Sequence, residues 1–422
     1  MTRAPGPKGS LVWGSLSEFK ADSLSFLSNA VREHGDIVRL RFGPVTAHLI
    51  NHPDHVEHIL SRKAANYDKA TRSADRIAAT TGDSLLSADQ LAWKRHRQLI
   101  QPAFQPSCFQ DIGPVIDTLM EPMLDRWQRN ETIDIVDEMM QLVIAVAIKV
   151  LFSSDIDPQQ INTALETVLA DTWRRIEAPV DASMISARLH RPAFKQAIGA
   201  IDQIVFDLIQ TRRKCPQRPN DVLSRLLAAH EAEGEIQLSD KELRDATVTL
   251  LLAGHETTAN ALSWAFIHAS NGFEKADPAH IFAEAIRLYP SIWIIERRAI
   301  RDDTINGYHI PRGSSVLISP YLLHRHKDFW PEPERFDPTR FAGDQPRLCD
   351  AYLPFGLGPH RCVGLYLANN IATHVIKRVF ARFRLRLLPN QLMGTSPGIT
   401  LRHKGPVKMQ VGSRGEGSIF PS

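Results

Sequence analysis

The spacing of apolar residues changes along this chain, and the changes predict its elements. Between residues 36 and 53, Val38, Leu40 and Phe42 alternate with arginines and a Gly-Pro turn follows, which predicts a pair of strands with one buried face. From there to about residue 265 the apolar period is that of a helix, and turns rich in Pro, Gly or Asp separate the segments. The predicted helices in this part span residues 115–127, 137–152, 161–176, 192–213 and 221–230.

Strand signals return around residues 304–319, where an Asn-Gly pair marks a turn. A further helix is predicted at 363–383. Residues 412–422 are rich in Gly and Ser, so we expect a folded domain over 1–411 and a disordered tail after it. The helices are too numerous and the strands too few for a doubly wound sheet. The pattern therefore predicts a single, mainly α domain with a small β part.

Composition and charge argue against several classes of protein. The 422 residues are 43% hydrophobic and 23% charged, and the net charge of +3 is too small to indicate nucleic-acid binding. Four cysteines without a CxxC pair fit a reducing compartment. The N-terminus lacks the apolar segment of a secretion signal, and no stretch reaches the roughly 18 apolar residues of a membrane span. We therefore expect a soluble cytoplasmic protein that binds neither nucleic acid nor membrane.

One cysteine lies in a Gly/Pro-rich loop that leads into the helix predicted at 363–383. The loop reads Phe355-Gly-Leu-Gly-Pro-His-Arg-Cys-Val-Gly364. It places Cys362 beside the helix start, where unpaired N–H groups and the helix dipole favour a thiolate. Gly358 and Gly364 leave room for a flat ligand to approach the backbone. Because a lone cysteine is more commonly a buried structural residue, the thiolate interpretation depends on the other motifs.

A long helix is predicted from Ser239 to about residue 270, roughly 48 Å at about 1.5 Å per residue. Ser239 and Glu242 form a capping box at its start. In its middle, Gly254 is followed by Glu256 and Thr257, a combination that indicates a local distortion around a small polar ligand. The alternative is a packing notch whose hydroxyls are satisfied within the helix.

Two shorter motifs complete a set. Alone, an acid and a base three residues apart are typical of a surface ion pair, and a Trp four residues before an Arg is typical of an amphipathic basic helix. Together and in this order, the segments resemble the cytochrome P-450 family over residues 5–411. The motifs are Trp93-x-x-x-Arg97, Ala253-Gly-x-Glu256-Thr-Thr258, Glu284-x-x-Arg287, Pro338-x-Arg340-Phe341 and the loop from Phe355 to Gly364.

The resemblance implies a cytochrome P-450 fold that holds haem b between the long helix and the helix after Cys362. Cys362 would be the thiolate ligand of the iron, which favours O–O cleavage. The propionate carboxylates need buried basic partners. The expected partners are Trp93, Arg97, His360 and Arg297, with the adjacent Arg298 as the alternative register. Other expected contacts of the cofactor in the cysteine loop are Phe355, Gly358 and Gly364.

The resemblance also assigns the acidic residues. Glu256 and Thr257 match the acid–alcohol pair that delivers protons during oxygen activation. Glu284, Arg287 and Arg340 match a structural triad. The implied activity is a monooxygenase that inserts one atom of O2 into an apolar small organic molecule.

Electrons are expected from a separate partner, because the chain carries no nucleotide loop and no flavin or iron–sulfur module. A ferredoxin or flavodoxin would serve, with NAD(P)H acting only through a reductase. The expected basic docking residues are Lys94, Arg95 and Arg361. The segments expected to contact substrate are 71–90, 175–190 and 291–295, the last an apolar stretch around Trp293.

The chain departs from the family in one place. Only residues 259–283 separate Thr258 from Glu284, where relatives carry a longer connection with a helix pair. If the shortened connection impairs electron delivery, the alternative is a haem-binding sensor or carrier without turnover. A helical binding protein without haem is a third possibility, which the basic set disfavours.

Overall fold

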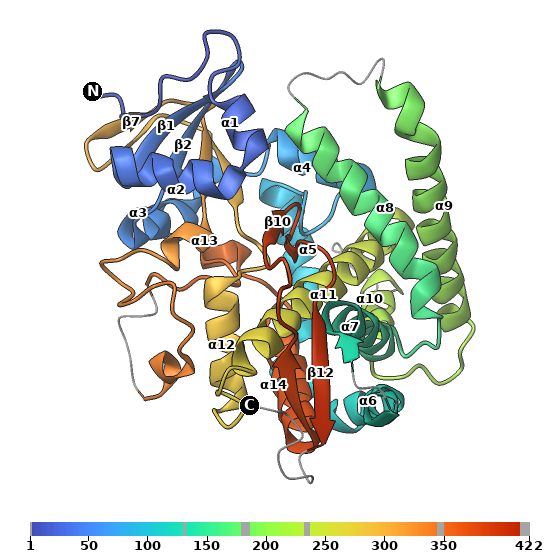
Figure 1. Ribbon diagram of the computed structural model, residues 1–422. Helices are drawn as coiled ribbons and strands as arrows, with labels where there is room; N and C mark the ends of the chain where they lie inside the picture. The colour runs from blue at the N-terminus through green and yellow to red at the C-terminus, as the bar shows by residue number, and fades with distance from the viewer. Residues whose placement is uncertain (1, 130–131, 179–185, 232–236, 344–349, 414–422) are drawn as a thin grey trace.

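The computed structural model describes residues 2–129, 132–178, 186–231, 237–343 and 350–413, and most of them are helical (Figure 1). The α-helices are α1 (Leu16–Ala21), α2 (Ser23–His34), α3 (Pro53–Glu57), α4 (Arg72–Thr81), α5 (Gln90–Ile100), α6 (Gly113–Arg129), α7 (Ile135–Phe152), α8 (Pro158–Glu177), α9 (Ser186–Arg213), α10 (Val222–Glu231), α11 (Asp240–Ala269), α12 (Pro278–Leu288), α13 (Pro320–Leu323) and α14 (Leu365–Arg382).

Short strands make up the β part. They are β1 (Ile37–Phe42), β2 (Val45–Ile50), β3 (Tyr67–Asp68), β4 (Thr132–Asp134), β5 (Ile295–Ala299), β6 (Asp303–Ile305), β7 (Tyr308–Ile310), β8 (Ser315–Ile318), β9 (Phe383–Leu387), β10 (Thr395–Pro397), β11 (Leu401–His403) and β12 (Lys408–Ser413). The mainly α fold class is thereby confirmed, as are the helices predicted in the first half, each within a few residues of its bounds.

Helix α11 runs through the middle of the molecule and organises its core (Figure 1). Ser239 accepts the Glu242 N–H and the Glu242 carboxylate accepts the Ser239 N–H, so the predicted capping box is present. Most α11 side chains are buried against α7, α9, α12 and α14. Such a helix is apolar nearly all round because it has core on every side.

The middle of α11 is helical throughout, including Gly254 and Thr257. A Cβ at Gly254 would lie 3.4 Å from Leu151 Cδ1 of α7, an ordinary van der Waals contact, so packing alone does not require a glycine here. The Thr257 hydroxyl donates to the Ala253 carbonyl oxygen at 2.9 Å. This hydroxyl is therefore satisfied within the helix, as the alternative interpretation of the sequence expects.

The predicted strand pair is confirmed as β1 and β2, antiparallel with Val38 opposite Leu49. Parallel pairing of β2 with β8 extends it to a sheet in the order β1-β2-β8-β5-β3, seen at the upper left of Figure 1. The predicted Asn-Gly turn joins β6 and β7, where Asn306 and Gly307 both have positive φ. Strands β9 to β12 near the C-terminus were not predicted from the sequence.

The predicted end of the folded domain needs correction. Strand β12 continues to Ser413 and pairs with β9 and β4, so the folded domain extends beyond 411; residues 414–422 lie outside the described residues. Helix α4 occupies the first half of the segment 71–90, which the resemblance expects to contact substrate. Of the segment 175–190, residues 179–185 lie outside the described residues.

The connection between α11 and α12 is short, as the sequence indicated. Helix α11 ends at Ala269, turns cover residues 270–276, and α12 begins at Pro278 with Asp277 as its N-cap.

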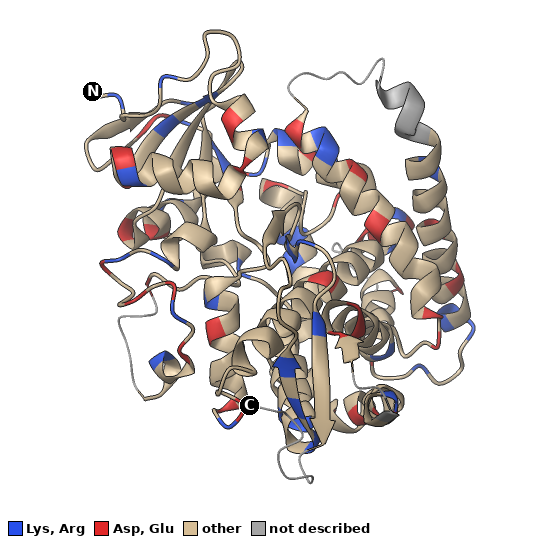
Figure 2. Cartoon of the chain, in the orientation of Figure 1, with Lys and Arg blue, Asp and Glu red and all other residues tan. Residues whose placement is uncertain are grey.

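The surface helices carry charges of both signs. Acidic and basic residues are interspersed along α8 and α9 (Figure 2). Within the described part of the chain, no helix is both long and apolar enough to cross a membrane.

Candidate functional site

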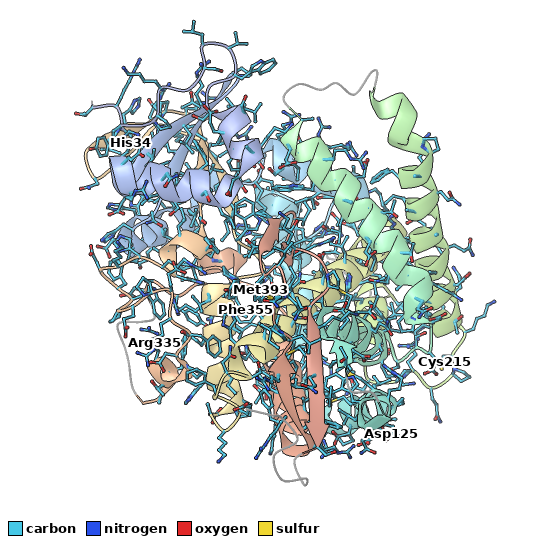
Figure 3. The ribbon with its side chains drawn as sticks, in the orientation of Figure 1. His34, Asp125, Cys215, Arg335, Phe355 and Met393 are labelled. Atoms are coloured by element: carbon cyan, nitrogen blue, oxygen red, sulfur yellow. The ribbon has the colours of Figure 1, made fainter. Side chains whose placement is uncertain are left out.

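Cys362 lies just before α14, whose N-cap is Gly364. Its backbone N–H donates to the Phe355 carbonyl oxygen at 2.9 Å, which closes the loop on itself. Phe355 lies near the middle of the view in Figure 3. Burial of the thiol among neighbouring protein atoms raises the pKa of Cys362, although N–H groups at Gly364 and Leu365 act in the opposite direction. The residue as a whole is nevertheless exposed.

Gly358 and Gly364 of this loop have different surroundings. Gly358 has a φ of +68°, and a Cβ there would collide with the Leu60 carbonyl oxygen in the single turn η1 (His58–Arg62). This glycine therefore makes room for a neighbouring backbone and not for a flat ligand. A Cβ at Gly364 would meet only Cys362 Sγ, at 3.9 Å.

Basic and aromatic side chains from three segments gather beside this loop. On α5, the Trp93 ring packs on the His360 ring with 3.8 Å between centroids. Arg97, one turn further along α5, donates from Nη1 to the Arg361 carbonyl oxygen at 2.7 Å. Its charge lies close enough to Cys362 for each to affect the pKa of the other. Arg97 thus joins α5 to the cysteine loop.

Arg297 on β5 belongs to the same set. Burial lowers its pKa to about 10, although Asp89 and Glu296 partly oppose the shift. Among the described residues no carboxylate forms an ion pair with it. The adjacent Arg298 instead binds Asp68, with 2.6 Å between Nη2 and Oδ2. The two arginines therefore have different surroundings, which the sequence could not distinguish.

Lys69 was missed by the sequence analysis because it belongs to none of the motifs. Its Nζ donates to the Leu85 carbonyl oxygen at 2.6 Å and lies 5.9 Å from the centre of the Trp93 ring. Burial, together with the charges of Arg297 and Arg97, lowers the pKa of Lys69 to about 7. The lysine therefore lies within the same group of cations.

His360 shows how closely these groups approach one another. Burial and the charges of Lys69, Arg297 and Arg97 lower its pKa to about 3. Its Nδ1 is buried and has no hydrogen-bond partner in the described part of the chain. These basic groups destabilise one another's charged forms, and no described carboxylate forms an ion pair with them. Such a group of side chains is suited to bind an anion.

The acid and alcohol of α11 are held differently. Glu256 is only 2% exposed, and its Oε1 accepts hydrogen bonds from Thr400 Oγ1 at 2.8 Å and from Arg402 Nε on β11. Its Oε2 is buried without a partner. Thr400 and Arg402 were not predicted, because the strand pair β10–β11 that carries Arg402 gives no clear pattern in the sequence.

The Glu284-x-x-Arg287 pair is completely buried, which excludes a surface ion pair. Arg287 donates from Nε and Nη2 to the two carboxylate oxygens of Glu284, at 2.6 and 2.8 Å. Arg340 Nε lies 3.4 Å from the same carboxylate. Arg287 also donates to carbonyl oxygens of the segment that follows α13, at His324, Pro333 and Arg335.

Two further expectations need correction. Lys94 and Arg361 are exposed, but Arg95 is bound to the Glu242 carboxylate and the Gln237 carbonyl oxygen. Trp293 is fully buried between Phe19 and Trp173, and its indole N–H donates to a backbone oxygen. It is a core residue and does not line an open pocket.

These features fit a haem. A cysteine sulfur stands at the start of α14, and cations without carboxylate partners stand beside it, as a thiolate-bound iron with two propionates requires. The His360 ring is neutral at pH 7, and its Nδ1, which has no partner among the described residues, would donate to the same anion in the tautomer that carries the proton there.

Comparisons with known proteins agree with this geometry. The family model described as "Cytochrome P450" matches residues 4–271 and 279–411, and the gap falls in the short connection before α12. The chain is 31% identical to cyclooctatin synthase of Streptomyces melanosporofaciens over 92% of its own length and 90% of that protein. It is 32% identical to cyclooctat-9-en-7-ol 5-monooxygenase of the same organism, over 87% and 86% of the two chains. Pentalenene oxygenase of Streptomyces avermitilis is 26% identical, over 93% and 94%.

The match covers nearly the whole chain, and both the fold and the chemistry of the cysteine loop agree with it. The chain therefore belongs to the cytochrome P450 family: it is a haem-dependent monooxygenase that receives electrons from a redox partner and inserts one atom of O2 into an apolar organic molecule.

Proposed function

We propose that Cys362 ligates the iron of a haem b, and that the surrounding cations bind its propionates. The proposal rests on one observation, the convergence beside Cys362 of basic groups that form no ion pair with a described carboxylate. Metal coordination would deprotonate the thiol, although burial alone raises its pKa. The propionate partners would be Trp93, Arg97, Arg297 and His360, with Lys69 added by the structure. Phe355 and Gly364 would hold the loop below the haem.

The carbon monoxide spectrum of the reduced protein tests this assignment. Wild-type protein is expected to give the red-shifted band of a thiolate-ligated haem, and Cys362→Ala to lose it. Cys108→Ala is the matched control, because Cys108 is half-buried and its Sγ points to a backbone oxygen.

Transfer of haem to apomyoglobin tests the propionate contacts. The Arg297→Gln variant should lose its haem faster than the Arg298→Gln variant. Equal rates for both variants would contradict the choice of Arg297.

The acid and alcohol of α11 would control protons above the cofactor. When bound, the haem supplies oxygen activation; the protein must supply protons while it keeps bulk water out. Glu256 Oε2 is buried without a hydrogen-bond partner among the described residues, so this oxygen would be the one that meets the proton relay through a bridging water. Arg402 and Thr400 would keep the carboxylate in one orientation by binding its other oxygen.

A ferredoxin or flavodoxin is the redox partner that the exposed charges favour, with NAD(P)H acting only through that partner's reductase in the cytoplasm. Lys94 and Arg361 are exposed on the two segments that Arg97 joins. The rate of reduction by an acidic ferredoxin should therefore fall as salt is added. Lys94→Gln should lower this rate, and Arg32→Gln on the distant helix α2 should not. A rate independent of salt would contradict the proposal.

The names of the relatives point to a substrate class. Proteins named for cyclooctatin, cyclooctat-9-en-7-ol and pentalenene suggest a polycyclic terpenoid as the apolar substrate here. Such a molecule would displace water beside the iron, so binding can be followed by the change in the haem absorption spectrum. Saturable changes with cyclic terpenes and none with linear fatty acids of equal carbon number are expected. The reverse preference would overturn this class.

A further inference from the structure

A second concave site lies away from the haem residues, on the β-sheet at the upper left of Figure 1. The hollow measures about 570 Å³ and is bordered by β1, β2, the N-terminal segment and the turn between β7 and β8. This volume lies within the range of small-molecule binding sites, roughly 300 to 1,000 Å³. None of the residues proposed to hold haem or protons lines it.

The charges around this hollow are of one sign. Arg3, Arg39 and Arg312 line it, and no acidic residue does so among those the structure describes. None of the three guanidinium groups forms an ion pair with a described carboxylate. Asp302 contacts two residues of the lining: it accepts the Arg312 backbone N–H at 2.7 Å and lies 3.6 Å from His309 Nε2. Guanidinium groups gathered without acids are suited to bind phosphate through paired N–H donors.

His48, which also lines the hollow, has an unpaired polar atom. It lies opposite Arg39 in the β1–β2 pair and is only 1% exposed. Among the described residues, its Nδ1 has no hydrogen-bond partner. Burial and the charges of Arg39 and His309 lower the pKa of His48 to about 4, so the ring is neutral at pH 7. The free nitrogen of this buried, neutral imidazole lacks a hydrogen-bond partner. An anion bound in the hollow would accept a hydrogen bond from it in the tautomer that carries the proton on Nδ1.

One side of the hollow is apolar. Pro44, Val45 and Pro311 line it, and Val45 is 41% exposed at the start of β2. A ligand that fills the space therefore needs an organic part as well as an anionic group. We propose that this hollow binds a small organic molecule carrying a phosphate or diphosphate group, with the anion against Arg39, Arg312 and His48. The three arginines that line the hollow, Arg3, Arg39 and Arg312, match a multiply charged phosphate better than a single carboxylate.

Calorimetric titration of the haem-loaded protein with inorganic diphosphate tests the site. We expect one saturable site whose dissociation constant rises about tenfold in Arg312→Gln, since a charge-assisted hydrogen bond is lost. Arg301→Gln removes the same charge from an exposed position outside the hollow and should leave binding unchanged. Diphosphate should also protect Arg39 and Arg312 from phenylglyoxal, which mass spectrometry can map without any variant.

The same phosphate could belong to a lipid headgroup, and flotation with phosphatidic acid vesicles distinguishes the sources. Vesicle binding lost in Arg312→Gln but kept in Arg301→Gln would support the site with a lipid as its source. Diphosphate binding without vesicle binding would support a soluble ligand. Binding of neither probe, or equal loss in both variants, would overturn the proposal, as would acetate binding as tightly as diphosphate.

Discussion

Glu256 and Thr257 are neighbours on α11, but different kinds of hydrogen bond hold their side chains. The Glu256 carboxylate is held at one oxygen by Thr400 and Arg402. Thr257 donates to the Ala253 carbonyl oxygen of its own helix, and that bond can be exchanged for one to water without breaking the helix. The threonine is therefore the mobile member of the pair.

Thr257→Ala should retain haem, because the hydroxyl belongs to none of the groups beside Cys362. It should consume reductant with a product yield roughly tenfold lower, since proton relays contribute factors of about 100 or more, and release peroxide instead. Product and peroxide per NAD(P)H measure this. Thr247→Ala is the matched control, because Thr247 makes the same bond to the residue four before it, at 2.8 Å. An unchanged product yield in Thr257→Ala would contradict the assignment.

Gly358 offers a second test at the scale of one residue. Its positive φ and its approach to the Leu60 carbonyl oxygen both disfavour a side chain. Gly358→Ala should lower the free energy of unfolding by about 2 kcal/mol or more. Gly356 has a similar positive φ, +73°, and nothing lies near the position that a Cβ would take. The Gly356→Ala variant therefore measures the cost of the backbone conformation alone. Equal losses in denaturant unfolding would show that the Leu60 contact is unimportant.

At the scale of elements, the start of α11 is tied to α5. Glu242 caps α11 and also binds Arg95 and His96 of α5. Burial alone would raise the pKa of Glu242, but hydrogen bonds from Ser239, His96 and Arg95 outweigh it and lower the pKa to about 2. The helix that carries Trp93 and Arg97 is thereby fixed against the helix that carries the acid–alcohol pair.

This pair of helices should respond to acid. Because the folded pKa of Glu242 lies below its ordinary value of 4.5, its ionised form stabilises the fold above that pH. The contribution falls as the pH drops from about 4.5 towards 2. The free energy of unfolding of the wild-type protein should decline more steeply across this window than that of Glu242→Gln. Parallel pH profiles for the two proteins would contradict the role of this carboxylate.

At the scale of the whole molecule, the Glu284–Arg287–Arg340 unit connects segments far apart in the chain. It ties α12 to the chain after α13 and to the turn η6 (Pro338–Phe341). Since the α11–α12 connection is short, α12 lies directly against α11 and α14. The unit therefore fixes the side of the fold on which α14 and the cysteine loop lie.

Removal of Arg287 should have a large effect on stability, because the Glu284 carboxylate would remain buried without compensation. Arg287→Ala is expected to cost about 3–5 kcal/mol of unfolding free energy. Arg287→Lys should recover little of it, since lysine cannot replace the paired N–H donors. Arg335→Ala breaks an exposed pair with Glu332 and serves as the control. Denaturant unfolding followed by circular dichroism gives all three values.

Local patterns in the sequence were sufficient for the elements whose formation depends on near neighbours. The capping box, the helical period and the Asn-Gly turn all act within a few residues, so α11, the helices of the first half and the β6–β7 hairpin were predicted. Strands β9 to β12 were not, because short strands depend on partners distant in the chain. The cysteine loop was found because its chemistry requires a continuous motif.

Ordered local motifs are enough to identify the family and to find the cysteine loop, because each motif lies within a few consecutive residues. Which cations lie together depends on the folded chain. It separated Arg297 from Arg298, which is bound to Asp68, added Lys69, and brought Arg402 to Glu256. The physical reason is that charge interactions depend on distance and burial, which the fold sets between residues far apart in sequence.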